Sequence, residues 1–551
     1  MITVTPVAAL YLYLDWRAEK RWSESVAMLK REGETLSLMD LMPPRLPESE
    51  NFAALPELRG INIIEEGDDK KGASGAKRQA LLDLMSGLEK ITPRMYQGIT
   101  LGRSPDWSEI MAELKTASFI TDLPPMGKET EAFKFAIETR NPLLKVLSEA
   151  SSSYQDAEWV PAMRDQILPK HLAALHVPHY NAIKMTCQAL NLHAIAAAES
   201  GKASAALDDY RTISLLSKAL VREPLMTGHL LSLLNNRNGL EIVWCLLKQR
   251  RLQESGLADL HAVLSTFRPE QSFQLGLRGE LITGVNNLDA LATDPDGNGL
   301  YALAGMNVKN GDIRSWIGRA VPDSFFTESR AAFVELHMDH FMLPMKRGGT
   351  WDVVRQKDTL FEALGRGGLY DPPFERFLAR LFLPLFITAA ERTLHVEAMR
   401  QQAIVACALE RFLIANGRYP EHLDELVPQF LASVPLDPVD QLPLRYRQGD
   451  SGRYRIWCVG MDGVDNDGQV NLGPGDNPES ILSKPHYQGD WTWQYDPVPH
   501  LPTPSRLSPP LGGLPQGDWT WQYDPAPQLQ IPSGLSPPLG GLPPPSEPLG
   551  N

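Results

Sequence analysis

Apolar side chains recur every three or four positions from about residue 90 to about residue 290, and this spacing constrains the fold more than any other feature. It places those side chains on one face of an α-helix, and few runs of β-branched residues favour strands instead. The clearest pair of helices is predicted over 190–200 and 204–221, with Gly201 at the turn between them and Pro224 after the second. The fold class is therefore predicted as mainly α, an antiparallel helical array.

The pair of helices at 190–221 resembles a hairpin of the tetratricopeptide type. No second copy follows at the period of about 34 residues that such repeats have. A general helical array with a concave binding surface is therefore the main expectation, and tetratricopeptide-like hairpins are the alternative.

Breaks in the helical pattern divide the chain into several units, as its 551 residues require. Its 43% hydrophobic and 22% charged residues are typical of folded domains. The predicted units are a candidate truncated membrane anchor at 1–14, an N-terminal helix and polar tether at 15–89, the helical body at 90–372, a long helix with a small β-sheet domain at 373–483, and a disordered Pro/Gly-rich tail at 484–551.

The N-terminal residues 2–14 form a short apolar run followed by Trp16, and they include Tyr11 and Tyr13, side chains typical of a membrane interface. Two interpretations stand: the last part of a membrane anchor, or the amphipathic start of a helix in a soluble domain. Basic residues at 17–21 favour a cytoplasmic domain after an anchor, which conflicts with an envelope location of the body. Membrane association through the N-terminus is thus one expectation.

Proline residues limit the elements predicted on either side of the helical body. A helix is predicted over 15–40, ending before Pro43 and Pro44, with a polar tether over 43–80. A long helix is predicted over 374–416, bent at Pro384, with its apolar part at 381–390 buried in the body.

The tail contains a duplication, because residues 488–497 return as 516–525 after 28 positions. Its Pro, Gly and Ser content predicts an extended, mobile segment. Trp491 and Trp493 of the first copy are predicted to dock on the small domain, which leaves the second copy without a place to bind.

An ordered series of motifs lies near the C-terminus. The segment ERFLIANGRYPEHLDELVPQFLASVPLDPVDQLPLRYR, followed by GRYRIWCVGMDGVDNDG, resembles the C-terminal region of type II secretion major pseudopilins. The resemblance implies a long helix packed on a small antiparallel sheet that closes in an ion-binding loop. Alternating residues at 444–447 and 453–459 independently predict two strands.

The chain departs from the pseudopilin pattern in one respect, because the matching helix is internal here, whereas pseudopilins carry theirs at the mature N-terminus. A processed filament subunit is therefore not inferred. The whole chain also resembles uncharacterised bacterial envelope proteins that join a membrane anchor, a helical body and such a module. That resemblance implies a cell-envelope protein, anchored in the inner membrane or periplasmic.

A cluster of acidic residues supplies the predicted metal site, at Asp462, Asp465 and Asp467. Carboxylate oxygens in a glycine-flexed loop suit Ca²⁺, and the position of the loop matches the ion-binding loop of the family. The alternative is a solvated acidic turn, because the spacing departs from an EF-hand. A second acidic turn at 294–298 is a weaker candidate.

Two histidine clusters supply an alternative function, a metal-dependent hydrolase. His171, His176 and His179 form the first, and His337 and His340 form the second, beside Glu335 and Asp339. Histidines three apart on a helix can share a metal ion, but neither cluster has HExxH spacing. Surface or core histidines without a metal are the competing interpretation.

The four cysteines Cys187, Cys245, Cys407 and Cys458 have no CxxC spacing, so buried thiols are expected, with a Cys407–Cys458 disulfide as the alternative. The net charge of −14 disfavours nucleic acid as a partner. No phosphate-binding loop or nucleophile elbow occurs in the sequence. The leading hypothesis is therefore a non-enzymatic structural or interaction protein of the bacterial envelope, with protein partners and a calcium-binding module.

Overall fold

The computed structural model describes residues 4–59, 104–116, 127–140, 143–159, 177–293, 321–365, 374–449, 453–469 and 489–494. Residues 1–501 form one compact unit, and the second unit, 502–551, lies outside the described residues. Within the first unit the chain is predominantly helical, with one small antiparallel sheet, as predicted. The acidic turn at 294–298 and most of the duplication also lie outside the described residues.

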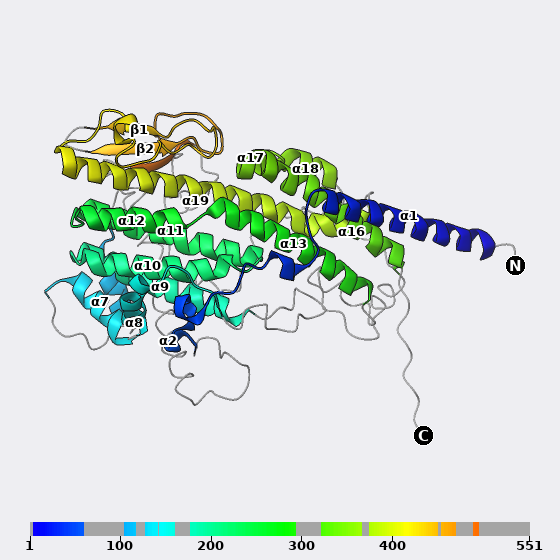
Figure 1. Ribbon diagram of the computed structural model, residues 1–551, viewed down its shortest axis with the longest axis horizontal. Coiled ribbons are helices and arrows are strands. Elements are labelled where there is room, and N and C mark those ends of the chain that lie inside the picture. The colour runs from blue at the N-terminus through cyan, green and yellow to red at the C-terminus, as the bar shows by residue number, and fades with distance from the viewer. Residues whose placement is uncertain are drawn as a thin grey trace, which may run out of the picture. The chain divides into compact units, whose positions relative to one another are not determined.

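The predicted helical hairpin is confirmed as α9 (Pro178–Glu199) and α10 (Ala203–Val221), which pack against each other and against α11 (Met226–Gln249). Gly201 has φ +78°, and the Lys202 amide donates to the Ala197 carbonyl (2.8 Å), which closes the end of α9. The facing surfaces of α9 and α10 are rich in alanine and leucine that are fully buried. Figure 1 shows this hairpin stacked with α11 and α12.

The remaining helices of the body surround this core (Figure 1). Their bounds are α6 Trp107–Thr116, α7 Glu129–Arg140, α8 Leu143–Ala150, α12 Glu254–Thr266, α13 Pro269–Ala292, α16 Asp323–His337, α17 Leu343–Val354 and α18 Lys357–Leu364. A π-helical turn, Met338–Met342, joins α16 to α17. Gly348 and Gly349 have non-helical backbone angles inside α17, so the helix is kinked there.

The long helix α19 (Phe377–Asn416) connects the helical body to the sheet. It contacts α11, α12, α13 and α17 and also β2 and β3. Gly417, with φ +71°, donates its amide to the Leu413 carbonyl (2.8 Å) and ends the helix where the sequence predicts. The expected burial of 381–390 holds only in part, because Leu381 is exposed while Leu383 is buried.

The sheet has the order β1 (Arg445–Gln448), β2 (Tyr454–Cys458) and β3 (Trp491–Gln494), all antiparallel. The first two strands match the predicted pair. The third confirms that Trp491 and Trp493 dock on the small domain, and both indoles are buried. The predicted boundary at residue 484 is therefore wrong, because it removes a strand from its sheet.

Side chains of α19 fix the sheet on the helix. The Gln402 amide, itself buried, donates to the main-chain carbonyl of Trp491 (2.6 Å) and contacts the Cys458 sulfur at 3.6 Å. All four cysteines are buried free thiols, so no Cys407–Cys458 disulfide is present. Figure 1 shows β1 and β2 on one side of the C-terminal half of α19 and α12 on the other.

The N-terminal helix α1 (Val4–Arg31) begins earlier and ends earlier than the helix predicted over 15–40. The chain then continues through short 3₁₀ turns, Leu38–Leu41, Glu48–Glu50 and Phe52–Ala54, and the single helical turn α2 (Pro56–Arg59). Phe52 and Leu58 are fully buried, and the Asn51 side chain donates to the Glu158 carbonyl (2.7 Å). The predicted polar tether is therefore wrong for residues 43–59, because apolar and amide side chains among the polar ones fix this segment on the body.

Candidate functional sites

The acidic loop lies beside the sheet, but its three predicted ligands have separate partners. Asp465 accepts from Arg445 Nε (2.9 Å) and from the Trp457 indole (2.9 Å). Asp467 pairs with Arg447, whose Nη1 is 2.6 Å from Oδ2. Each of these two carboxylates therefore has a guanidinium partner.

Asp462, the third predicted ligand, accepts only main-chain amides among its described partners, from Val464 (3.1 Å) and Gly489 (3.4 Å). No group of three or more His, Cys, Asp or Glu side chains in the described part of the chain is arranged to hold a metal ion. No sequence motif marks Asp490, which directly precedes β3 and accepts from the amides of Asn466 (3.0 Å) and Gly468 (2.7 Å), so that it helps to shape the loop.

Arg445 is the centre of a larger ion cluster. Besides Asp465 it contacts the fully buried Asp437 (2.8 Å) and Asp440. Burial raises the pKa of Asp437 to about 6, although amide donors from Val439 and Val459 act in the opposite direction. The guanidinium group of Arg445 thus lies among the carboxylates of Asp437, Asp440 and Asp465.

The histidines of the two clusters that lie among the described residues have different partners. His171 and His176 lie outside the described residues. His179 bonds to Glu223 (2.9 Å) and stacks on Trp159. His337 instead packs among the rings of Phe333, Phe341 and Phe386.

In the second cluster, burial affects both histidines, and Glu335 has a partner of its own. Burial lowers the pKa of His337 to about 3 and also lowers the pKa of His340. Glu335 is bound through both oxygens to Arg21, at 3.0 and 2.7 Å. No observation in this part of the chain favours a shared metal.

A polar network centred on a buried histidine joins α7, α9 and α10, and no sequence motif marks it. His193 lies between Asp209 (Nδ1 to Oδ2, 2.6 Å) and Glu138 (Nε2 to Oε1, 3.1 Å). Since each ring nitrogen faces a carboxylate, both donate, and the ring is an imidazolium. Burial alone would lower the pKa of His193, but these two hydrogen bonds outweigh it and raise the pKa to about 9.

The first turns of α1 are uncovered and carry apolar side chains on all sides of the helix, and we call this exposed end the N-terminal face. It consists of Leu10, Tyr11, Leu12, Tyr13 and Trp16, and the exposed fractions of Leu12 and Trp16 are 70% and 59%. In Figure 1 this end of α1 extends beyond α16. No described helix is both long enough and apolar enough to cross a bilayer.

The base of the same helix is firmly held. Arg17 pairs with Glu328 (2.8 Å), and Arg21 bridges Glu328 (2.7 Å) and Glu335 on α16. These partners raise the pKa of Arg21 against the opposing effect of burial, so it stays charged. The N-terminal face is therefore presented by a helix whose later turns are fixed to the body.

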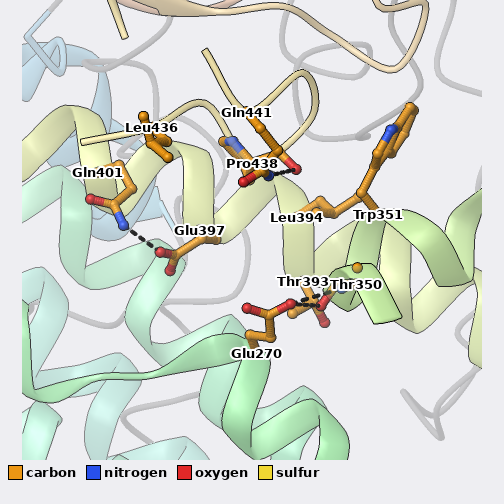
Figure 2. Close-up of a pocket in the computed structure, with 11 residues that line it drawn as sticks. Glu270, Thr350, Trp351, Thr393, Leu394, Glu397, Gln401, Leu436, Pro438 and Gln441 are labelled. Atoms are coloured by element: carbon orange, nitrogen blue, oxygen red, sulfur yellow. Dashed lines mark hydrogen bonds between the residues drawn. The ribbon is translucent and has the colours of Figure 1, made fainter. Parts of the chain in front are cut away.

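A cavity of about 290 Å³ lies between the helical body and the small domain. Figure 2 shows side chains from α13, α17, α19 and the segment 436–441 around it. Its polar lining includes Glu270, Glu397 and Gln401, and its apolar lining includes Trp351, Leu394 and Leu436. No sequence motif marks it, because its walls come from four separated parts of the chain.

Comparison with family models, with curated proteins and with solved structures finds no match to this chain. The small sheet packed on α19 is therefore an observed feature, whereas its kinship with pseudopilins stays a prediction.

Proposed function

We propose that this protein is a structural or interaction protein of the bacterial cell envelope that attaches to a membrane surface through the N-terminal face of α1. The observation that supports it best is the exposure of Leu10, Leu12 and Trp16 on a helix fixed to the body by Arg21. The helical array and the pseudopilin-like module would then be presented to a protein partner.

The composition of the N-terminal face suits a bilayer interface. Tyr11, Tyr13 and Trp16 each combine an apolar ring with a polar atom, which favours the boundary between headgroups and acyl chains. Tyr13 lies beside Trp16, with ring centroids 6.1 Å apart, and Lys20 lies over the Trp16 ring at 5.6 Å. A cation at this position adds attraction to anionic headgroups.

The small domain adds the calcium prediction for Asp462, Asp465 and Asp467. An added Ca²⁺ would compete with Arg447 for Asp467, and that pair is more than half exposed on both sides, so it is a weak competitor. Arg445 holds Asp465 in a less exposed setting and is the stronger one. Asp462, with amide partners alone, is the carboxylate most open to an ion.

Membrane attachment is tested by flotation with vesicles of phosphatidylethanolamine and phosphatidylglycerol, and with vesicles of phosphatidylcholine alone. The variant carries Leu10→Gln, Leu12→Gln and Trp16→Gln, because glutamine preserves helix propensity. Removing three apolar side chains should lower the partition coefficient at least about tenfold. The wild type is expected to float with both vesicles, and more strongly with the anionic ones.

The control has three similarly exposed apolar residues replaced elsewhere, Ile414→Gln, Leu442→Gln and Val464→Gln. It should float like the wild type. Equal flotation of both triple variants, or none by the wild type, would contradict the proposal.

A further inference from the structure

The cavity between the helical body and the small domain contains a carboxylate held in a defined orientation. Glu270, in the first turn of α13, accepts the Thr350 amide (2.8 Å) and the Thr350 hydroxyl (3.3 Å), both on Oε1. Among the described residues no donor reaches Oε2. One oxygen is thus fixed, and the other, on a residue that is exposed to solvent, is accessible to a ligand.

The break in α17 is what allows this arrangement. Gly349 has φ +72°, and a Cβ built there would lie 2.1 Å from Glu270 Oε1. Only glycine lets the backbone approach the carboxylate this closely while it turns the Thr350 amide toward it. The non-helical backbone at Gly349 therefore brings the Thr350 amide within hydrogen-bonding distance of Glu270.

The second carboxylate of the cavity is already neutralised. Arg400, buried on α19, binds Glu397 through Nε (2.8 Å) and Nη2 (2.6 Å), and the Gln401 amide donates to it at 2.6 Å. Glu270 has no such partner, since none of the described lining residues is a cation. The cavity therefore keeps a net negative charge at Glu270.

The rest of the wall is suited to an apolar stem. Figure 2 shows Trp351, Leu394, Leu436 and Pro438 on the sides of the cavity across from Glu270. An indole face also attracts cations. An anion would be repelled by Glu270, and a purely apolar ligand would gain no hydrogen bond from it.

We propose that this cavity binds a primary ammonium or guanidinium group carried on a short apolar stem. The cation donates to Glu270 Oε2, and the stem packs on Trp351 and Leu394. Either a free amine or the basic side chain of a protein partner has this chemistry. The site shares no residue with the N-terminal face, so a failure of one proposal would not affect the other.

Calorimetric titration of the full chain tests this with n-pentylammonium and with 1-pentanol, a neutral molecule of the same shape. The ammonium is expected to bind saturably and the alcohol at least about tenfold more weakly, because a charge-assisted hydrogen bond is lost. Equal binding of the two would overturn the proposal. N-acetyl-lysine methylamide is titrated in parallel: binding assigns the site to a protein side chain, and failure beside a binding n-pentylammonium assigns it to a free amine.

Glu270→Gln keeps an acceptor for Thr350 and removes the charge, so it should weaken n-pentylammonium binding about tenfold or more. Glu24→Gln, an equal change at an exposed position on α1, should leave binding unchanged. A second variant, Leu436→Lys, adds a cation at a half-exposed wall position and should also weaken binding, while Leu436→Met should not. Unaltered binding in Glu270→Gln and Leu436→Lys, or equal losses in Glu24→Gln, would overturn the proposal.

Discussion

At the scale of single residues, two clusters of charged groups in the described part of the chain are held by partners from outside their own helix or strand. His193 lies between Glu138 and Asp209, and Arg445 lies among Asp437, Asp440 and Asp465. Because removing one partner leaves an uncompensated charge inside the protein, such clusters are sensitive to pH and to substitution.

His193 should make the stability of the body fall between about pH 7 and pH 9. Its folded pKa, about 9, lies above the ordinary 6.5, so its contribution is complete below pH 6.5 and is lost as the pH rises through 9. The full effect is roughly 3 kcal/mol. Urea unfolding at a series of pH values measures it.

Two variants, one at His193 and one at another histidine, test whether His193 causes this decline. His193→Gln should remove most of the decline above pH 7. His261→Gln should not, since burial lowers the pKa of His261 and keeps it neutral throughout this range. A wild-type stability that is flat from pH 7 to 9 would refute the role given to His193.

Calcium binding by the acidic loop should appear as a rise in Tm of the protein when Ca²⁺ replaces a chelator. When the Ca²⁺ concentration is 100 times the Kd of the site, binding adds about 2.7 kcal/mol to the stability of the domain. Arg447→Gln should increase the effect because it frees Asp467, and Asp462→Asn should diminish it. If Ca²⁺ leaves Tm unchanged in the wild type and in Arg447→Gln, the loop is an acidic turn closed by arginines.

At the scale of elements, α19 is the part that organises the molecule. It packs against α11, α13 and α17 of the helical body, and β2 and β3 pack against it. Its end at Asn416 was predictable because Gly417 and Pro420 are local signals. The third strand was harder to predict as a strand, because its four residues lie in a duplicated segment rich in Pro and Gly.

The duplication offers a matched test of β3. Trp493→Ala removes a fully buried indole and should lower the free energy of unfolding by about 3–5 kcal/mol. Trp521→Ala makes the same change in the second copy, and we expect little effect because β2 pairs with the first copy. Equal losses in chemical unfolding of the two variants would contradict this assignment.

At the scale of the whole molecule, the sequence was most informative where a local signal decides the structure. Gly201 marks the turn of the central hairpin, and alternation at 444–447 and 453–459 marks two strands. The site residues were less predictable, since the partners of Asp465 and His193 are brought near by folding. The cavity at Glu270 has no local signal either, because α13, α17 and α19 assemble it together.

Attachment through the N-terminal face can be measured with a spin label at residue 12. Leu12→Cys can be labelled selectively because the four native thiols are buried. Val464→Cys, exposed to a similar degree on the small domain, is the reference position. With anionic vesicles, the label at 12 should become more accessible to oxygen and less accessible to an aqueous nickel complex, while the label at 464 stays unchanged. A label at 12 that remains as accessible to the nickel complex as the label at 464 would show that the N-terminal face does not enter the bilayer.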